Sequence, residues 1–162
     1  MIVPWSPAYR SDFESLNREW LERWFTVEPI DEVYFADPVG TILQPGGAIW
    51  FALEDVAQDR ASPDGRPVGT VAAIRRDAST FEMAKMGVTA AAQGRGIGRA
   101  LAETVVRHAA EAGAKRVVLL SHTSLVTAIR LYERLGFRHT ETPVVSGYAR
   151  GNVSMQLDLP PA

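Results

Sequence analysis

Hydrophobic and polar residues alternate with helical spacing near the start of the chain. A short apolar segment at 2–5 is compatible with a strand. From Pro7 onward, large apolar residues recur every three or four positions with charged residues between them, which predicts an amphipathic helix that Pro29 ends. These apolar residues are Phe13, Leu16, Trp20, Leu21 and Trp24. A short second helix should follow, capped by Asp31 and ending before Asp37.

The middle of the chain has the pattern of three consecutive strands. The apolar run 48–53 and the run 68–76 flank a polar segment, 54–67, that contains the turn signature Pro63-Asp64-Gly65. The two runs should therefore pair as an antiparallel hairpin. Residues 81–88, FEMAKMGV, are predicted to form the third strand.

The pattern changes after residue 88. A glycine-rich loop leads into a predicted helix over 96–112, and the run 115–121, KRVVLLS, is apolar enough to be buried on both faces of a sheet. This strand-helix-strand order predicts a right-handed parallel crossover. A helix over about 124–135 and strands near 137–145 and 151–159 complete the chain. The inward stripes of the two helices are predicted to be Ile97, Leu101, Val105 and Ala109, then Val126, Ile129, Leu131 and Leu135.

This order of elements predicts an α/β fold. We expect a mixed, mostly antiparallel sheet with a central parallel strand-helix-strand unit and flanking helices. The length of 162 residues suits one hydrophobic core, and no repeat, low-complexity segment or linker indicates a second one. Residues 1–162 are therefore expected to form a single domain.

Composition and charge exclude several classes of function. The chain is 46% hydrophobic with a net charge of −2 and no basic stripe, so no nucleic acid partner is expected. No apolar run approaches the roughly 20 residues of a membrane span, and the N-terminus does not resemble a signal peptide, which favours a cytoplasmic protein without a membrane partner. There is no cysteine, and the dispersed His108, His122 and His139 show no metal-ligand spacing, so we expect no metal.

The glycine-rich stretch QGRGIGRA, residues 93–100, admits three interpretations as a phosphate-binding loop. A P-loop needs Lys followed by Ser or Thr after its last glycine, whereas Arg99 and Ala100 follow Gly98. A dinucleotide fingerprint needs G-x-G-x-x-G and an acidic residue after the next strand, which here ends in Ser121-His122. The third pattern, Gln-x-x-Gly-x-Gly, is present from Gln93 to Gly98.

With its surroundings, this third pattern resembles the acyl-CoA loop of the GNAT superfamily of N-acetyltransferases. FEMAKMGV resembles the fourth strand of that family, and AIRLYERLGF, residues 128–137, resembles its signature helix and the strand that follows. The pieces stand in the family's order and at its usual spacings over residues 81–137. The resemblance implies the family's mixed α/β fold, acetyl-CoA as co-substrate and an amine acceptor; homodimers are common in the family.

The physical chemistry of the loop agrees with a phosphate ligand, with a glycine turn that binds nothing as the alternative. A helix N-terminus has unpaired N–H groups and a partial positive charge, and glycines let these amides approach a pyrophosphate closely. The resemblance further implies that the pantetheine arm pairs with the end of the strand 81–88. The candidate cofactor-binding residues are Met86, Gly87, Val88, Gln93, Gly94, Arg95, Gly96, Ile97, Gly98, Arg99, His122 and Tyr132.

Two residues are candidates for catalysis by their positions in the family pattern. Glu82, a lone carboxylate in an apolar strand, is the candidate base that takes a proton from the amine; the alternative is an edge charge or an ion pair with an arginine. Tyr132 stands where the family's general acid stands, facing the thiolate leaving group, with simple packing as the alternative. His122 could be an auxiliary base, a polar contact to the cofactor or a surface residue.

The resulting hypothesis is transfer of an acetyl group from acetyl-CoA to a primary amine of a small molecule or peptide. Without cysteine, direct attack within a ternary complex is favoured. The alternative is a coenzyme A-binding sensor or interaction module without catalysis. Trp20, Trp24 and Phe25 are interpreted as core residues, although the family uses this helical region to wall its acceptor site.

Overall fold

The computed structural model describes residues 1–54, 65–141 and 148–161. Within these residues, seven strands form one sheet in the order β1-β2-β3-β4-β5-β7-β6. The strands are β1 (Ile2–Pro4), β2 (Ala48–Glu54), β3 (Arg66–Arg75), β4 (Thr80–Val88), β5 (Arg116–Ser121), β6 (Arg138–His139) and β7 (Val153–Asp158). The α-helices are α1 (Arg10–Trp24), α2 (Pro29–Ala36), α3 (Ile97–Glu111) and α4 (Val126–Arg134), with shorter turns at Pro7–Tyr9, Val39–Leu43 and Ala90–Ala92.

The sheet is antiparallel except for one pair of strands at its centre. β4 and β5 run parallel, joined by α3, while every other neighbouring pair is antiparallel. The hairpin of β2 and β3 and the parallel crossover are therefore confirmed, as is the predicted mixed α/β fold.

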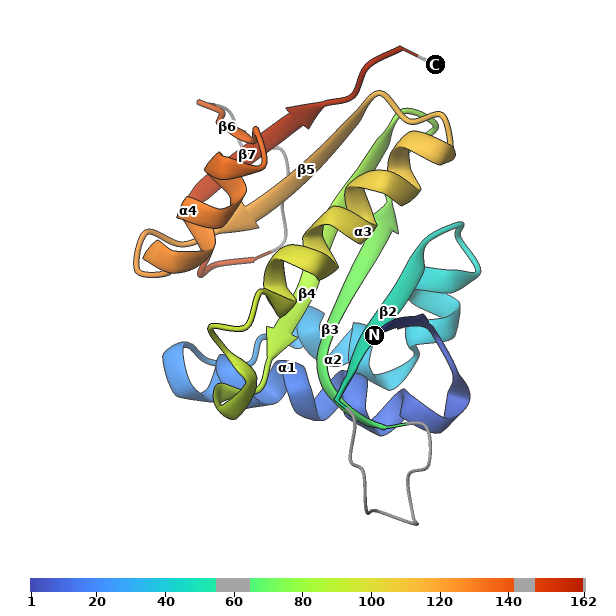
Figure 1. The fold of residues 1–162 in the computed structure, drawn as a ribbon, viewed down its shortest axis with the longest axis vertical. Helices are drawn as coiled ribbons and strands as arrows, with labels where there is room; N and C mark the ends of the chain where they lie inside the picture. Colours follow the sequence, from blue (N-terminus) through green and yellow to red (C-terminus); the bar gives the residue numbers. More distant parts are fainter. Residues whose placement is uncertain (55–64, 142–147, 162) are drawn as a thin grey trace.

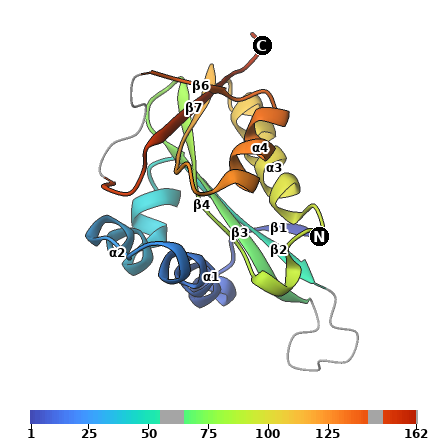
Figure 2. The same cartoon turned by 90° about the vertical axis from the view of Figure 1, so that its left-hand side faces the viewer.

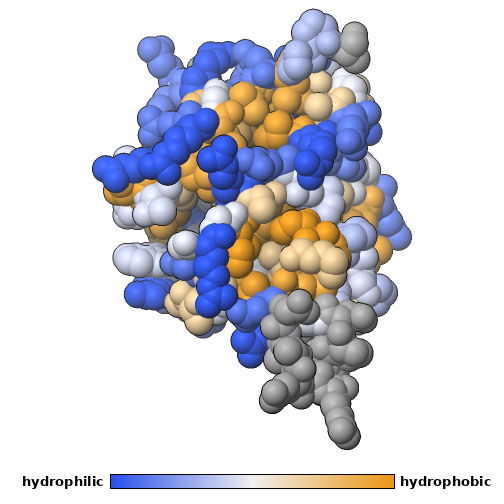
Figure 3. Space-filling model, in the orientation of Figure 1, coloured by the Kyte–Doolittle hydropathy of each residue, from blue (hydrophilic) through white to orange (hydrophobic). Residues whose placement is uncertain are grey.

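Helices cover both faces of the sheet. α1 and α2 lie on one face, and α3 and α4 lie on the other (Figures 1 and 2). Each face has its own hydrophobic cluster: Phe13 and Phe51 belong to the cluster beneath α1 and α2, and Phe81 and Leu101 belong to the one beneath α3. Hydrophobic side chains also reach the surface on the α3 face, in two areas separated by hydrophilic residues (Figure 3). No helix among the described residues combines the length and hydrophobicity of a membrane span.

The connection between α1 and α2 differs from the sequence prediction. α1 already ends at Trp24, and Pro29 opens α2 instead of ending α1. Glu28, not Asp31, is the N-cap, and the two carboxylates form a reciprocal capping box. Proline is favoured in the first turn of a helix because its missing N–H would be unpaired there anyway.

Two predicted apolar positions are wrong in detail. Val126, predicted to face inward, is 50% exposed, whereas Ile129, Leu131 and Leu135 pack against the core. Trp24, interpreted as core, is 57% exposed. Both residues lie at the ends of helices, where the chain turns away from the sheet and periodicity no longer determines the direction of a side chain.

The last strands are shorter than predicted within the described residues. The strand expected near 137–145 contains only β6 at Arg138–His139, and residues 142–147 lie outside the described part. The strand predicted at 151–159 is β7. The predicted turn at 63–65 also lies outside the described residues except for Gly65.

Two irregularities of β4 create the space for a site. β4 pairs with β5 only from Thr80 to Glu82, after which the two strands separate. The register of β4 against β3 then shifts by one residue near Lys85, whose φ of 53° lies in the left-handed region. At Gly87, a Cβ atom would lie 2.7 Å from the backbone oxygen of Leu16, so α1 packs closely against this part of β4.

Candidate functional site

A pocket of about 70 Å³ opens where β4 and β5 separate. Its walls come from β4, from the end of β5, from the C-terminal end of α1 and from the segment 148–151. The lining side chains used below are Trp20, Phe25, Glu82, Lys85, His122 and Arg150. The fold therefore brings two of the sequence-predicted residues, Glu82 and His122, to one cavity.

Glu82 is a buried carboxylate that is only partly engaged by its surroundings. Its side chain is 2% exposed, and its Oε1 accepts hydrogen bonds from Nε (2.8 Å) and Nη2 of Arg76. No described residue donates a hydrogen bond to its Oε2. Burial raises the pKa of Glu82, whereas Arg76 and Lys85 oppose that rise. Glu82 is thus ion-paired and retains one carboxylate oxygen for another partner.

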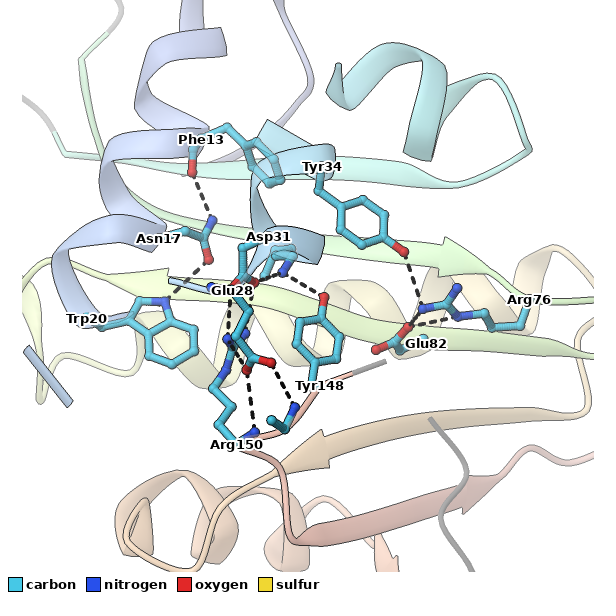
Figure 4. A network of polar contacts seen from close by, with 12 residues as sticks. Phe13, Asn17, Trp20, Glu28, Asp31, Tyr34, Arg76, Glu82, Tyr148 and Arg150 are labelled. Carbon is cyan, nitrogen blue, oxygen red and sulfur yellow. Dashed lines mark hydrogen bonds and ion pairs between the residues drawn. The ribbon is translucent and has the colours of Figure 1, made fainter. Parts of the chain in front are cut away.

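A second charged cluster lies beneath α2, next to Glu82 (Figure 4). Lys85 of β4 donates to Oδ1 of Asp31 (2.5 Å) and to the hydroxyl of Tyr148 (2.8 Å). Arg150 donates to both oxygens of Asp31 at 2.7 and 2.9 Å. Asp31 has no exposed surface. Burial alone would raise the pKa of Asp31, but the hydrogen bonds from Arg150 and Lys85 outweigh it and lower that pKa to about 2.

Glu28 completes this cluster and ties the segment after residue 147 to α2. Its side chain accepts hydrogen bonds from the backbone N–H of Ala149 (2.8 Å) and from Nη1 of Arg150 (2.9 Å). Glu28 and Asp31 therefore serve both as the capping box of α2 and as anchors of the segment that walls the pocket. None of these cluster residues was singled out from the sequence as part of a site, and Asp31 was predicted only as a helix cap. The one available signal was Lys85, a charge within an otherwise apolar strand.

The glycine loop presents backbone groups toward open space. Gly94 and Gly96 have φ of 80° and 79°, and a Cβ atom on either would meet nothing within 4 Å. Gly96 is the N-cap of α3, so the first N–H groups of that helix lie at this loop. Gln93 donates its side-chain amide to the carbonyl of Val88 (3.1 Å), which ties the loop to the end of β4.

The two arginines of the loop are exposed and pair with surface carboxylates. Arg95 lies 2.7 Å from Glu54, and Arg99 lies 2.7 Å from Glu103. The exposed fractions of the two arginine side chains are 57% and 58%. Ion pairs at such exposed positions contribute little to stability, so these guanidinium groups can exchange partners at low cost.

Tyr132 lies on α4 among the hydrophobic residues of the α3 face and is not part of the pocket lining. Its ring centre is 6.0 Å from that of Phe137, and burial raises its pKa to about 12. The ring therefore packs against the core, and its hydroxyl has no hydrogen-bond partner among the described residues.

His122 stands at the rim of the pocket. The backbone N–H of Ser124 donates to its Nδ1 (3.1 Å), and its ring packs edge-on against Phe25 with the centres 5.4 Å apart. Because Nδ1 accepts this hydrogen bond, the neutral ring carries its proton on Nε2. Among the described residues, no group of three or more acidic, histidine or cysteine side chains could hold a metal ion.

Comparisons with known proteins agree with this geometry. The profile of the acetyltransferase (GNAT) family matches residues 7–137. A mycothiol acetyltransferase of Gordonia bronchialis is 36% identical over 108 residues, which are 65% of this chain and 35% of that protein. The chain thus spans about a third of the length of the curated relatives it matches.

Solved structures show the same fold. A GNAT-family acetyltransferase from Staphylococcus aureus Mu50 has a TM-score of 0.85 at 19% identity, with 99% of each chain covered. An aminoglycoside 6'-N-acetyltransferase complexed with coenzyme A has a TM-score of 0.70 at 16% identity, with 100% of this chain and 98% of the other covered. Since the family profile matches most of the chain and the strand order includes the expected parallel crossover, the chain belongs to the GNAT family of acetyltransferases.

Proposed function

We propose that the chain transfers an acetyl group from acetyl-CoA to a primary amine, by direct attack of the amine nitrogen on the thioester in a ternary complex. The observation that carries this proposal is Glu82, whose Oε2 has no partner among the described residues and which lines the pocket between β4 and β5. An amine in that pocket would find a proton acceptor beside it. The chain has no cysteine that could form an acyl-enzyme.

The residues of the glycine loop fit the pyrophosphate of coenzyme A. The open space outside Gly94 and Gly96 and the free N–H groups at the start of α3 favour an anion there. Gly98 and Ile97 lie in the first turn of the same helix. The exposed Arg95 and Arg99 supply two further donors for phosphate oxygens.

The second half of β4 fits the pantetheine arm. Beyond Glu82, β4 is no longer paired with β5, so one edge of Met86, Gly87 and Val88 has no strand beside it among the described residues. An amide-bearing chain can pair along such an edge as an added strand. Gln93 holds the carbonyl of Val88 and would keep this edge in place.

Each catalytic side chain then has a defined task. An alkylammonium, with a pKa of about 10, must lose a proton before its nitrogen can attack, and Oε2 of Glu82 would accept that proton directly or through water. The free hydroxyl of Tyr132 would donate a hydrogen bond to the departing thiolate. Because burial raises the pKa of Tyr132 to about 12, hydrogen bonding is favoured over full proton transfer. His122, at the pocket rim, is an alternative route for the amine proton.

The direct test is a thiol-release assay with acetyl-CoA and a panel of amines. We expect release of coenzyme A that depends on the amine, with one acetylated amine formed for each thiol. Binding of coenzyme A without release of thiol for any amine would instead identify a non-catalytic binding module.

The glycine loop provides a matched pair of variants. Gly96 and Gly113 have nearly equal φ of 79° and 76°, both have open space where a Cβ would lie, and they stand at opposite ends of α3. Gly96→Val and Gly113→Val should therefore lose similar stability through backbone strain. Only Gly96→Val should weaken acetyl-CoA binding in a calorimetric titration, by roughly tenfold or more. Equal affinities of the two variants would contradict phosphate binding at this loop.

Arg76 should control the pH dependence of the reaction. Because Arg76 favours the ionised form of Glu82, its removal should raise the pKa of Glu82 further. In Arg76→Gln, the acidic limb of the profile of kcat/KM against pH should move to higher pH by about one unit or more. Arg75→Gln changes the neighbouring arginine, which lies over Phe81 instead, and should leave the limb in place. An unmoved limb in Arg76→Gln would count against Glu82 as the titrating base.

A further inference from the structure

Of the carboxylates around the pocket, one oxygen is open to a substrate. Both oxygens of Glu28 and of Asp31 accept hydrogen bonds from neighbouring residues. Oε1 of Glu82 is held by Arg76. This leaves Oε2 of Glu82, within the described residues, as the carboxylate oxygen of this cluster without a donor.

Among the described residues, the lysine and the arginines in and beside the pocket are all engaged. Lys85 pairs with Asp31, Arg150 pairs with Glu28 and Asp31, and Arg76 pairs with Glu82. Lys85 and Arg150 also lie over the ring of Tyr148, 4.7 and 4.6 Å from its centre. A substrate carboxylate would therefore find no unpaired cation among the described lining residues, and breaking a buried pair to bind one is costly.

Another part of the pocket lining is a row of three rings. Trp20 packs edge-on against Phe25 with ring centres 6.1 Å apart, and Phe25 packs edge-on against His122 at 5.4 Å. The indole N–H of Trp20 is directed to Asn17 (3.3 Å), so this ring offers the pocket carbon surface. Figure 4 shows Trp20 with its N–H toward Asn17, near the cluster of Glu28 and Arg150.

We infer that the acceptor is a small monoamine that carries an aromatic or flat apolar group. The inference rests on the proposed function and names its substrate class. The amine nitrogen would lie on the Glu82 side of the pocket, in reach of Oε2 directly or through water, and the apolar group would lie toward Phe25 and Trp20. Aromatic surfaces bind rings by stacking and burial. A second ammonium or a carboxylate on the acceptor would lose its hydration without gaining a partner.

Two matched pairs of amines test this substrate class. The first compares n-butylamine with 1,4-diaminobutane, which adds a cation, and the second compares 2-phenylethylamine with phenylalanine, which adds a carboxylate. We expect kcat/KM to be highest for 2-phenylethylamine, by roughly tenfold or more over n-butylamine, and lower for each doubly charged partner. A higher kcat/KM for the diamine or for phenylalanine would overturn the inference while leaving acetyl transfer to amines intact.

A pair of variants locates the aromatic wall. Phe25→Ala should remove most of the preference for 2-phenylethylamine over n-butylamine and leave acetyl-CoA affinity unchanged. Trp24→Ala is the matched control, because Trp24 is the adjacent aromatic residue and is 57% exposed. Melting temperatures of both variants check that they fold. An equal loss of rate for both amines in Phe25→Ala would contradict the assignment.

A binding measurement separates this inference from the proposed function. 2-Phenylethylamine is titrated by calorimetry into the protein saturated with coenzyme A, which cannot react. Binding that is lost in Phe25→Ala supports the aromatic site even if no amine releases thiol with acetyl-CoA. Absence of binding to the unmodified protein overturns the inference.

Discussion

Replacing Glu82 by glutamine is expected to lower the rate of acetyl transfer at neutral pH by about 100-fold or more. Glutamine keeps the shape of the side chain and can still accept a hydrogen bond from Arg76, but its amide cannot take a proton from an ammonium. The affinity for acetyl-CoA should be nearly unchanged, because the proposed phosphate and pantetheine contacts lie at the glycine loop and at the end of β4. Single-turnover transfer and calorimetric titration measure the two quantities separately.

The loss in Glu82→Gln should become smaller at high pH. More of the amine is then already neutral, so a protein base is needed less. Glu14→Gln is a suitable control, since Glu14 is a half-exposed carboxylate that also pairs with an arginine, Arg18. A Glu82→Gln variant with the wild-type rate at neutral pH would transfer the role of base to His122 or to water.

Replacing Asp31 by asparagine is expected to produce the largest loss of stability, about 3–5 kcal/mol. Asp31 has no exposed surface and accepts hydrogen bonds from Lys85 and Arg150. A neutral asparagine would leave the buried Lys85 and the partly buried Arg150 with one carboxylate fewer. It also belongs to the capping box of α2. Urea unfolding of both proteins measures the difference.

The partner of Asp31 offers an internal check. Adding Lys85→Met to Asp31→Asn should recover part of the stability, because the unpaired buried ammonium is then removed as well. Asp158→Asn breaks an exposed pair with Arg138 and should have a far smaller effect. If Asp31→Asn were as stable as Asp158→Asn, the buried cluster would not hold α2 and the segment after residue 147 in place.

Asp31 should also make the stability of the folded chain depend on pH. The pKa of Asp31 falls from its ordinary 3.8 to about 2 in the folded chain. Its carboxylate therefore contributes fully above the unfolded value and loses that contribution as the pH falls from 3.8 toward 2. The stability of Asp31→Asn should change less across this interval than that of the unmodified protein.

Most of the fold could be predicted from local patterns in the sequence. The stripe of Leu101, Val105 and Ala109 on α3 is buried as predicted, and the run that became β5 is apolar enough to mark a central strand. The predictions were wrong where neighbouring groups decide the structure. Pro29 is compatible both with the end of one helix and with the start of the next, and the capping box between Glu28 and Asp31 decided for the start.

The site could be predicted only in part. The pattern Gln-x-x-Gly-x-Gly indicated the loop at the start of α3, and the lone Glu82 in an apolar strand indicated a carboxylate of interest. Neither pattern contains the partner of Glu82. Arg76 reaches Glu82 because the chain reverses between β3 and β4. The sequence alone does not distinguish Arg76 from any other nearby arginine as the ion-pair partner of Glu82.

The sequence by itself determined the order of strands and helices, the family and the glycine loop, because these depend on the spacing of apolar residues and on the conformational freedom of glycine within a few neighbouring positions. Only the tertiary structure decided how the charges pair. Asp31 meets Lys85 and Arg150 from positions 54 and 119 residues away, and the separation of β4 from β5 opens a pocket between them. Such contacts follow from how the sheet and its helices pack. Burying a charge costs so much free energy that each buried charge needs a partner, but this cost does not determine which residue the partner is.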